Sequence, residues 1–217
     1  MYQNILFDLD GTLTDPGVGI TNSVAYALEK FGIKNADRTE LYKFIGPPLK
    51  DSFMEFYGFS ESDSLKAVDY YREYFREKGL FENKVIDGIP EMLGALKQLN
   101  KKIIIATSKP EEFTFRILEH FDLLKYFDFV AGATMDGSRS KKGDIIVYAL
   151  EKAEISSLAE TIMVGDREHD INGAHQAGID SVGVLFGYGS RDEFEKAGAT
   201  YIIENPGDLI SLLSTDL

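Results

Sequence analysis

The sequence predicts an α/β protein with a doubly wound parallel sheet and a small all-helical domain inserted after the first strand. Several short apolar runs lack in/out alternation, which is typical of strands buried on both faces. Amphipathic helix patterns lie between these runs, and strands that alternate with helices form parallel sheets covered on both faces. The connection from Phe7 to Lys102 is far longer than one crossover requires, so it predicts an insertion.

Strands are expected at 4–7, 102–106, 129–132, 161–164, 181–185 and 201–203. Helices of the α/β domain are expected at 89–99, 111–120, 144–152, 170–177 and 208–213. The inserted segment has only helical patterns, at 20–31, 39–44, 49–57 and 63–78. We therefore expect an α/β core of residues 1–15 and 86–217 and a helical domain of residues 16–85. Extra helical layers on the sheet are the alternative, disfavoured because a sheet face has room for few helices.

Composition and charge limit the functions that this chain can have. Its 217 residues are 44% hydrophobic and 27% charged, as in globular proteins, and they include no cysteine. Disulfides and zinc–thiolate sites are thereby excluded, and we expect a reducing, cytoplasmic location. A formal charge of −13 argues against nucleic acid as a partner. Because no apolar run could span a bilayer and no signal-peptide pattern is found, we expect no membrane association, and we expect a monomer.

Two aspartates stand where the first apolar run ends, in the stretch Asp8-Leu9-Asp10-Gly11-Thr12. Residues i and i+2 of an extended chain point to the same side, so Asp8 and Asp10 can converge. Two carboxylates that close repel each other, which raises one pKa or requires a cation between them. Gly11 permits the sharp turn that such a loop needs. An ordinary acidic turn is the alternative interpretation.

Two further segments between strands and helices have residues suited to an anion. Thr107 and Ser108 follow the second apolar run, where hydroxyl and N–H groups could hold an oxyanion. Either residue could instead cap the next helix, and the two roles are compatible. Lys141 and Lys142 precede another helix, although basic residues there oppose the helix dipole. A bound anion explains that placement better than a solvated basic loop does.

The fourth polar signal is Asp166, which ends another apolar run, with Asp170 at the start of the following helix. In open α/β sheets, ligands bind beyond the carboxyl ends of the strands. With Asp8 and Asp10, these aspartates supply hard oxygen ligands of the kind that Mg²⁺ takes together with waters and substrate phosphate. We therefore expect Mg²⁺ as the cofactor.

The ordered set of motifs resembles the haloacid dehalogenase (HAD) superfamily. The set comprises Asp8-x-Asp10-Gly11-Thr12-Leu13-x-Asp15, then Thr107, a lysine before a helix, and Gly165-Asp166-x-x-x-Asp170. The resemblance covers nearly the whole chain and implies a HAD-like Rossmannoid core with the helical insertion as a C1 cap. Segments 44–49 and 186–190 resemble the phosphoglycolate-phosphatase-like branch and its 5′-nucleotidase-like relatives.

This resemblance implies a Mg²⁺-dependent phosphomonoesterase that hydrolyses a small soluble phosphate ester through an aspartyl-phosphate. Asp8 would be the nucleophile, and Asp10 would protonate the leaving alkoxide and then deprotonate water. The metal would contact the Asp8 carboxylate, the Asp10 carbonyl and Asp166, with Asp170 orienting the site.

The family pattern also implies phosphate contacts from the Thr107 hydroxyl, a lysine, and the backbone N–H groups of Leu9 and Ser108. The third motif departs from the usual Lys-Pro-x-Pro, so Lys141 is preferred by its spacing after Ser140, with Lys142 as the alternative.

In the fourth motif, Arg167 either contacts the phosphate or pairs with Glu168. In the cap, Gly46, Pro47 and Pro48 are candidates for a loop that reads the substrate, and a plain turn between helices is equally expected.

A phosphoglycolate-type phosphatase is the leading functional hypothesis. A 5′-nucleotidase acting on nucleoside monophosphates, or a β-phosphoglucomutase-like mutase, would use the same four motifs. A receiver-like phosphoacceptor without enzymatic activity is disfavoured, because it needs neither an acid/base at Asp10 nor a long helical insertion.

Overall fold

The computed structural model describes residues 2–34 and 37–214 of the chain. Contacts within the chain define two compact units, one made of Met1–Asp15 with Val85–Leu217 and one made of Pro16–Lys84. Among the described residues, no helix combines the length and apolar character that a membrane span requires.

The larger unit is built on a six-stranded sheet in the order β5-β4-β1-β6-β7-β8, and all its neighbouring strands are parallel. The strands are β1 (Asn4–Phe7), β4 (Lys102–Pro110), β5 (Phe129–Ala133), β6 (Thr161–Gly165), β7 (Asp180–Val184) and β8 (Tyr201–Ile203). The chain passes from β1 outward to β4 and β5, then returns to β6 on the other side of β1. This reversal makes the carboxyl ends of β1, β4 and β6 the place where a ligand is expected.

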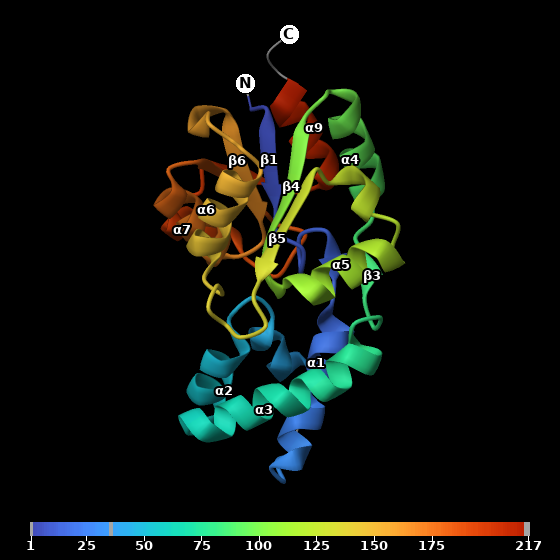
Figure 1. The fold of residues 1–217 in the computed structure, drawn as a ribbon, viewed down its shortest axis with the longest axis vertical. Coiled ribbons are helices and arrows are strands. Elements are labelled where there is room, and N and C mark those ends of the chain that lie inside the picture. The colour runs from blue at the N-terminus through green and yellow to red at the C-terminus, as the bar shows by residue number, and fades with distance from the viewer. Residues whose placement is uncertain (1, 35–36, 215–217) are drawn as a thin grey trace. The chain divides into compact units, whose positions relative to one another are not determined.

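Helices cover both faces of this sheet (Figure 1). On one face lie α4 (Ile89–Gln98), α5 (Glu111–His120) and α9 (Pro206–Ser214), and on the other α6 (Lys142–Lys152) and α7 (Glu168–Ala177). The helix α8 (Arg191–Ala197), which the sequence did not predict, packs beside α7, and its N-cap Ser190 accepts a hydrogen bond from the Glu193 N–H at 3.2 Å. Short 3₁₀ turns, η3 (Leu124–Tyr126) and η4 (Leu158–Glu160), complete the layers.

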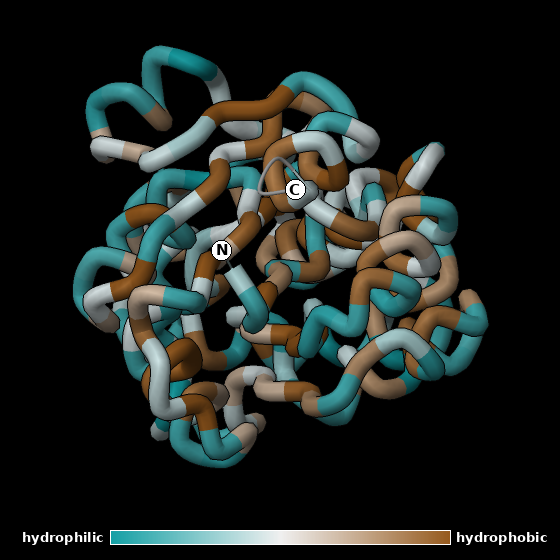
Figure 2. Tube along the Cα trace, turned by 90° about the horizontal axis from the view of Figure 1, so that it is seen from above, coloured by the Kyte–Doolittle hydropathy of each residue, from teal (hydrophilic) through white to brown (hydrophobic). Residues whose placement is uncertain are grey.

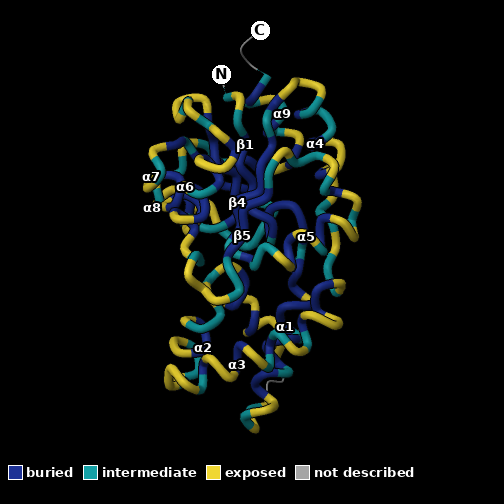
Figure 3. The backbone as a smooth tube through the Cα atoms, in the orientation of Figure 1, coloured by how far each residue is buried: buried dark blue, intermediate teal, exposed yellow. Residues whose placement is uncertain are grey.

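The central strands are buried on both faces. Ile5, Leu6 and Phe7 of β1 are all fully buried, which explains why the apolar runs lack alternation. Figure 3 shows β1, β4 and β5 as buried backbone, whereas the covering helices have exposed stretches. Along the chain, hydrophobic stretches alternate with hydrophilic ones, as buried strands and amphipathic helices require (Figure 2). The predicted α/β fold with a doubly wound parallel sheet is therefore confirmed.

The smaller unit is helical. It contains α1 (Gly17–Lys30), η1 (Thr39–Phe44), α2 (Leu49–Tyr57), α3 (Glu61–Tyr74) and the π-helical turn η2 (Phe75–Gly79), so the expected helix at 63–78 is α3 continued by a π turn. Its core is aromatic: Phe53 packs on Phe44 with ring centroids 5.0 Å apart and stacks on Phe59 at 5.8 Å.

Two short strands, β2 (Thr14–Asp15) and β3 (Lys84–Val85), pair in a separate sheet.

Candidate active site

The first motif continues β1 by one residue and then turns sharply. The Asp8 N–H donates to the carbonyl of Val164 at 2.9 Å, so Asp8 is still aligned with β6, and it is buried. Gly11 has a φ of +85°, which L side chains rarely adopt. A Cβ at Gly11 would also collide with the carboxylate of Asp166. The turn therefore needs glycine for its conformation and for its close approach to the second strand end.

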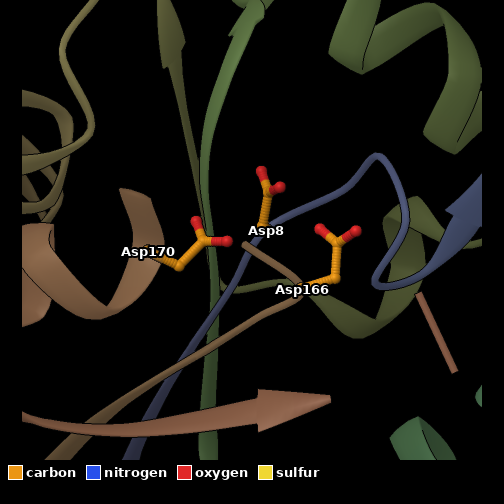
Figure 4. A group of neighbouring side chains, drawn as sticks. All are labelled: Asp8, Asp166 and Asp170. Carbon is orange, nitrogen blue, oxygen red and sulfur yellow. The ribbon is translucent and has the colours of Figure 1, made fainter. Parts of the chain in front are cut away.

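Three of the predicted aspartates meet in one buried cluster. One carboxylate oxygen each from Asp8, Asp166 and Asp170 lies within 4.8 Å of the others, and all three residues are buried. Asp8 follows β1, Asp166 follows β6, and Asp170 extends its carboxylate toward Asp8 from the first turn of α7 (Figure 4). Backbone donors fix two of them: the Tyr188 N–H to Asp166 at 2.9 Å and the Arg167 N–H to Asp170 at 3.1 Å.

Lys142 is the lysine that lies in this cluster. Its Nζ is 2.7 Å from Oδ1 of Asp8 and 2.8 Å from Oδ1 of Asp170, and it donates to the Ala106 carbonyl at 3.1 Å. The preferred candidate, Lys141, is instead the exposed N-cap of α6. The structure thus places the alternative in the site, because α6 begins at Lys142, two residues earlier than the sequence predicted.

The strand β4 extends beyond its predicted end and positions Thr107 and Lys109. Thr107 is buried, and its hydroxyl oxygen accepts the Lys109 N–H at 3.2 Å, so its own hydrogen is available to donate elsewhere. Neither Thr107 nor the half-buried Ser108 caps the next helix, since Pro110 is the N-cap of α5. Lys109 is buried and its ammonium donates to Oδ2 of Asp10. Sequence reasoning assigned no role to Lys109, because it lies beyond the predicted strand end at residue 106. Its burial is the informative signal, since a lysine is rarely buried unless it is paired.

Burial and charge shift the pKa values of this cluster. Burial raises the pKa of Asp166 well above its ordinary value, and the charges of Asp8 and Asp170 raise it further. Burial likewise raises the pKa of Asp170 to about 6, against the opposing effect of Lys142. Burial also raises the pKa of Asp10, although Lys109 opposes this shift. For Lys142, burial alone would lower the pKa, but the charges of Asp170 and Asp8 raise it above the ordinary value.

The cluster therefore has an excess of negative charge. Two buried lysines face four carboxylates, and burial makes Asp10, Asp166 and Asp170 costly to ionise without further positive charge. The donors are hard carboxylate oxygens from two strand ends and a helix start. This donor set fits a hard divalent cation such as Mg²⁺, which would offset the excess charge.

The segment 186–190 after β7 closes over Asp166, a role that its sequence did not reveal. Side chains at Gly187 or Gly189 would collide with Asp166, and the Tyr188 N–H donates to that carboxylate at 2.9 Å. The hydroxyl of Tyr188 donates to Oδ1 of Asp15. The two flanking glycines were the available signal, because they permit close backbone approach.

Comparison with known proteins identifies the family. The family model described as haloacid dehalogenase-like hydrolase matches residues 5–184, which include all the residues of the buried cluster. The chain belongs to this family. The predicted family resemblance is therefore confirmed, and so is the prediction of an enzyme that is a phosphatase.

Several proteins and solved structures are similar to this HAD enzyme. It is 46% identical over 200 residues to a 5′-nucleotidase from Pseudomonas aeruginosa, covering 92% of this chain and 90% of the relative. It is 38% identical over 201 residues to tyrosine-protein kinase PtkA from Mycobacterium bovis, covering 92% and 68% respectively. The solved structure of a predicted phosphatase from Clostridium acetobutylicum superimposes with a TM-score of 0.95 at 50% identity, covering 98% of both chains.

The sequence also singled out Arg167 and the segment 46–48 of the HAD enzyme. Arg167 forms an ion pair with Glu193 at 3.0 Å, a partner that neither sequence-based alternative named. The same Glu193 oxygen accepts the Glu168 N–H at 2.7 Å, so this pair joins α8 to the start of α7. In the smaller unit, Gly46, Pro47 and Pro48 connect η1 to α2, and Gly46 has a φ of +102°.

Proposed function

We propose that this phosphatase uses Mg²⁺ and hydrolyses a small phosphate ester through an aspartyl-phosphate on Asp8. One observation supports the proposal above all: Asp8 lies beside the buried carboxylates of Asp166 and Asp170 and only 2.7 Å from the Lys142 ammonium. A phosphoryl group, which is anionic, needs positive charge beside a carboxylate nucleophile, and this arrangement supplies it from the chain and from the metal that the carboxylates would hold.

Asp8, Asp166 and Asp170 are proposed to hold Mg²⁺, with the Asp10 carbonyl as a further ligand. When bound, the metal supplies positive charge that offsets the carboxylate repulsion and stabilises the transferring phosphoryl group. Lys142 neutralises charge on the phosphoryl oxygens and keeps the Asp8 carboxylate oriented. The Thr107 hydroxyl donates to a phosphoryl oxygen, as do the backbone N–H groups of Leu9 and Ser108.

The chain's own side chains carry the two chemical steps. The Asp8 carboxylate attacks phosphorus and the ester P–O bond breaks, while Asp10 gives a proton to the departing oxygen. Asp10 then takes a proton from water as that water attacks the aspartyl-phosphate, which releases phosphate and regenerates Asp8. Both roles require Asp10 to lie beside Asp8, as the turn at Gly11 permits.

The smaller unit, Pro16–Lys84, is proposed as a cap that excludes bulk water and selects the substrate. Nucleoside 5′-monophosphates are the first substrates to test, because the relative that is 46% identical is named 5′-nucleotidase. Phosphoglycolate, which the sequence motifs favoured, is the second. Gly46, Pro47 and Pro48 are the proposed specificity loop.

A panel of phosphate esters tests this function. Wild type, Asp8→Asn and Asp10→Asn are assayed for phosphate release with Mg²⁺ and with EDTA. We expect release by wild type with Mg²⁺, none with EDTA, and none from Asp8→Asn. The panel also includes ATP with a tyrosine-containing peptide, because one relative is named a tyrosine-protein kinase. We expect the enzyme to release phosphate from the esters and to transfer no phosphoryl group from ATP to the peptide. Full activity of Asp8→Asn contradicts the covalent mechanism.

A further inference from the structure

We propose that Lys109 is a positioning residue for Asp10: it holds one carboxylate oxygen so that the other is the oxygen that transfers the proton. This inference rests on the proposed function and extends it. The Lys109 ammonium donates to Oδ2 of Asp10, and the two side chains are only 5% and 14% exposed. Oδ1 of Asp10 is buried and has no hydrogen-bond partner among the described residues. The two oxygens of this carboxylate therefore have different environments.

An irregularity in β4 brings Lys109 to this position. Ala106 pairs with Ala131 and Pro110 pairs with Ala133, so four steps along β4 correspond to two along β5. Extra residues of this kind form a bulge, which redirects side chains and is common beside active sites. The Lys109 N–H is fixed to the Thr107 hydroxyl at 3.2 Å.

Close packing leaves little room for the bulge to move. A Cβ at Gly132 on the neighbouring strand would lie only 2.8 Å from the Lys109 carbonyl oxygen. The bulge thus rests directly on the backbone of β5, and the lysine that it carries is buried rather than solvated. Lys109 is held in place before any substrate arrives, which is what a positioning residue requires.

The two buried lysines of the site contact different carboxylates. Lys142 contacts Asp8 and Asp170, whereas Lys109 contacts Asp10. A lysine that only offset the negative charge of the cluster would affect every substrate alike. A lysine that orients Asp10 affects only those steps in which Asp10 must transfer a proton.

The chemistry of the first step separates these two roles. As the bond between Asp8 and phosphorus forms, the ester P–O bond breaks and the proton on Oδ1 of Asp10 moves to the leaving oxygen, which departs as an alcohol. A weakly basic leaving group such as p-nitrophenolate departs without that proton. Loss of the orienting contact should therefore slow alkyl phosphates far more than aryl phosphates.

The test measures kcat/KM of Lys109→Met for aryl and alkyl phosphates whose leaving groups span a range of pKa values. This constant reports only the steps up to departure of the alcohol, so hydrolysis of the intermediate does not mask the effect. We expect kcat/KM to fall about 100-fold or more for alkyl phosphates, the size of a general-acid contribution, and to stay close to wild type for p-nitrophenyl phosphate. The plot of log kcat/KM against leaving-group pKa should therefore be steeper for the variant.

Three further variants make the result specific. Lys109→Arg keeps a charged donor and should restore the wild-type slope. Lys101→Met is the matched control, because Lys101 is also buried and donates to the Tyr2 carbonyl at 2.7 Å, before the amino-terminal end of β4. It should leave the slope unchanged. Lys109→Gln keeps a hydrogen-bond donor without the charge, and it should steepen the slope less than Lys109→Met does. It provides the test if Lys109→Met does not fold.

An equal fall for all leaving groups, or an unchanged slope, overturns the role of Lys109 while the phosphatase proposal stands. If wild type hydrolyses none of the esters, or Asp8→Asn retains activity, the proposed function fails, and this inference fails with it.

Discussion

The Nζ atom of Lys142 lies 2.7 Å from Oδ1 of Asp8, although 134 positions separate the two residues in the chain. The contact is buried, and the same ammonium reaches Asp170 at 2.8 Å. One lysine thus bridges the carboxylate that follows β1 and the carboxylate at the start of α7, so the site depends on the parallel sheet that brings these elements together.

Replacing Lys142 tests this bridge. Lys142→Met should lower kcat/KM for every ester by about 100- to 1,000-fold, because it removes a buried charge that stabilises the transferring phosphoryl group. Lys141→Met is the matched control, since Lys141 is adjacent but exposed, and it should remain near wild type. Steady-state kinetics of both variants decide between the two lysines, and a larger loss for Lys141→Met contradicts the assignment.

Replacing Asp166 should separate stability from metal binding. Asp166 is buried among like charges, and its raised pKa shows that ionisation there is unfavourable in the absence of a metal. Asp166→Asn should therefore raise the Tm of the metal-free protein at pH 7.5 and abolish the increase in Tm that Mg²⁺ gives wild type. Asp192→Asn, on an exposed residue, should change neither quantity. A lower metal-free Tm for Asp166→Asn, with the Mg²⁺ response intact, contradicts this prediction.

The stabilisation that Mg²⁺ provides should weaken in acid. The pKa of Asp170 is raised from 3.8 to about 6 in the metal-free fold, so the folded state binds a proton more readily than the unfolded chain does. The cost of ionised Asp170 is present above pH 6 and is relieved as the pH falls from about 6 toward 4. Protonation in the same window competes with the metal.

The measurement is Tm with and without Mg²⁺ from pH 8 to pH 5. The difference between the two values should shrink as the pH falls through about 6. Asp170→Asn should give a smaller difference that varies less with pH. A difference for wild type that stays constant over this range contradicts the role of Asp170.

A methyl group at Gly11 should disrupt the site. Gly11→Ala combines an unfavourable φ of +85° with a collision against Asp166, and we expect a loss of about 1–3 kcal/mol in the free energy of unfolding. Gly94→Ala is the matched control in α4, where nothing lies within 4 Å of the new Cβ, and it should stabilise by about 0.5–1 kcal/mol. Denaturant unfolding measures the free energy of unfolding of both variants. Equal changes in this free energy for Gly11→Ala and Gly94→Ala would show that a side chain at position 11 does not collide with Asp166.

The parallel sheet and the aspartate cluster were predictable because local signals encode them. Continuous apolar runs mark buried strands, and Asp8 and Asp166 directly follow two of them. The lysines were harder to predict because their placement depends on tertiary structure. Lys142 rather than Lys141 faces Asp8 because of where α6 begins, and Lys109 reaches Asp10 through a bulge that only the pairing with β5 reveals.

The helix α8 and the ion pair of Arg167 were missed for related reasons. A helix of seven residues gives too short a pattern to recognise by periodicity. Once α8 exists, Glu193 on it becomes the partner of Arg167, so missing the helix also concealed the pair. Long-range contacts of this kind have no signature in the local sequence.

Trapping the phosphorylated form of Asp8 tests the covalent mechanism. Asp10→Asn should transfer the phosphoryl group of p-nitrophenyl phosphate to Asp8 but hydrolyse the intermediate slowly, because it lacks the base that activates water. Rapid mixing with Mg²⁺ should give a burst of one p-nitrophenolate per active site. Mass spectrometry after an acid quench should place the phosphoryl group on Asp8, and Asp8→Asn should show neither signal. A phosphoryl group on another residue, or turnover of Asp8→Asn without any labelled protein, would contradict nucleophilic attack by Asp8.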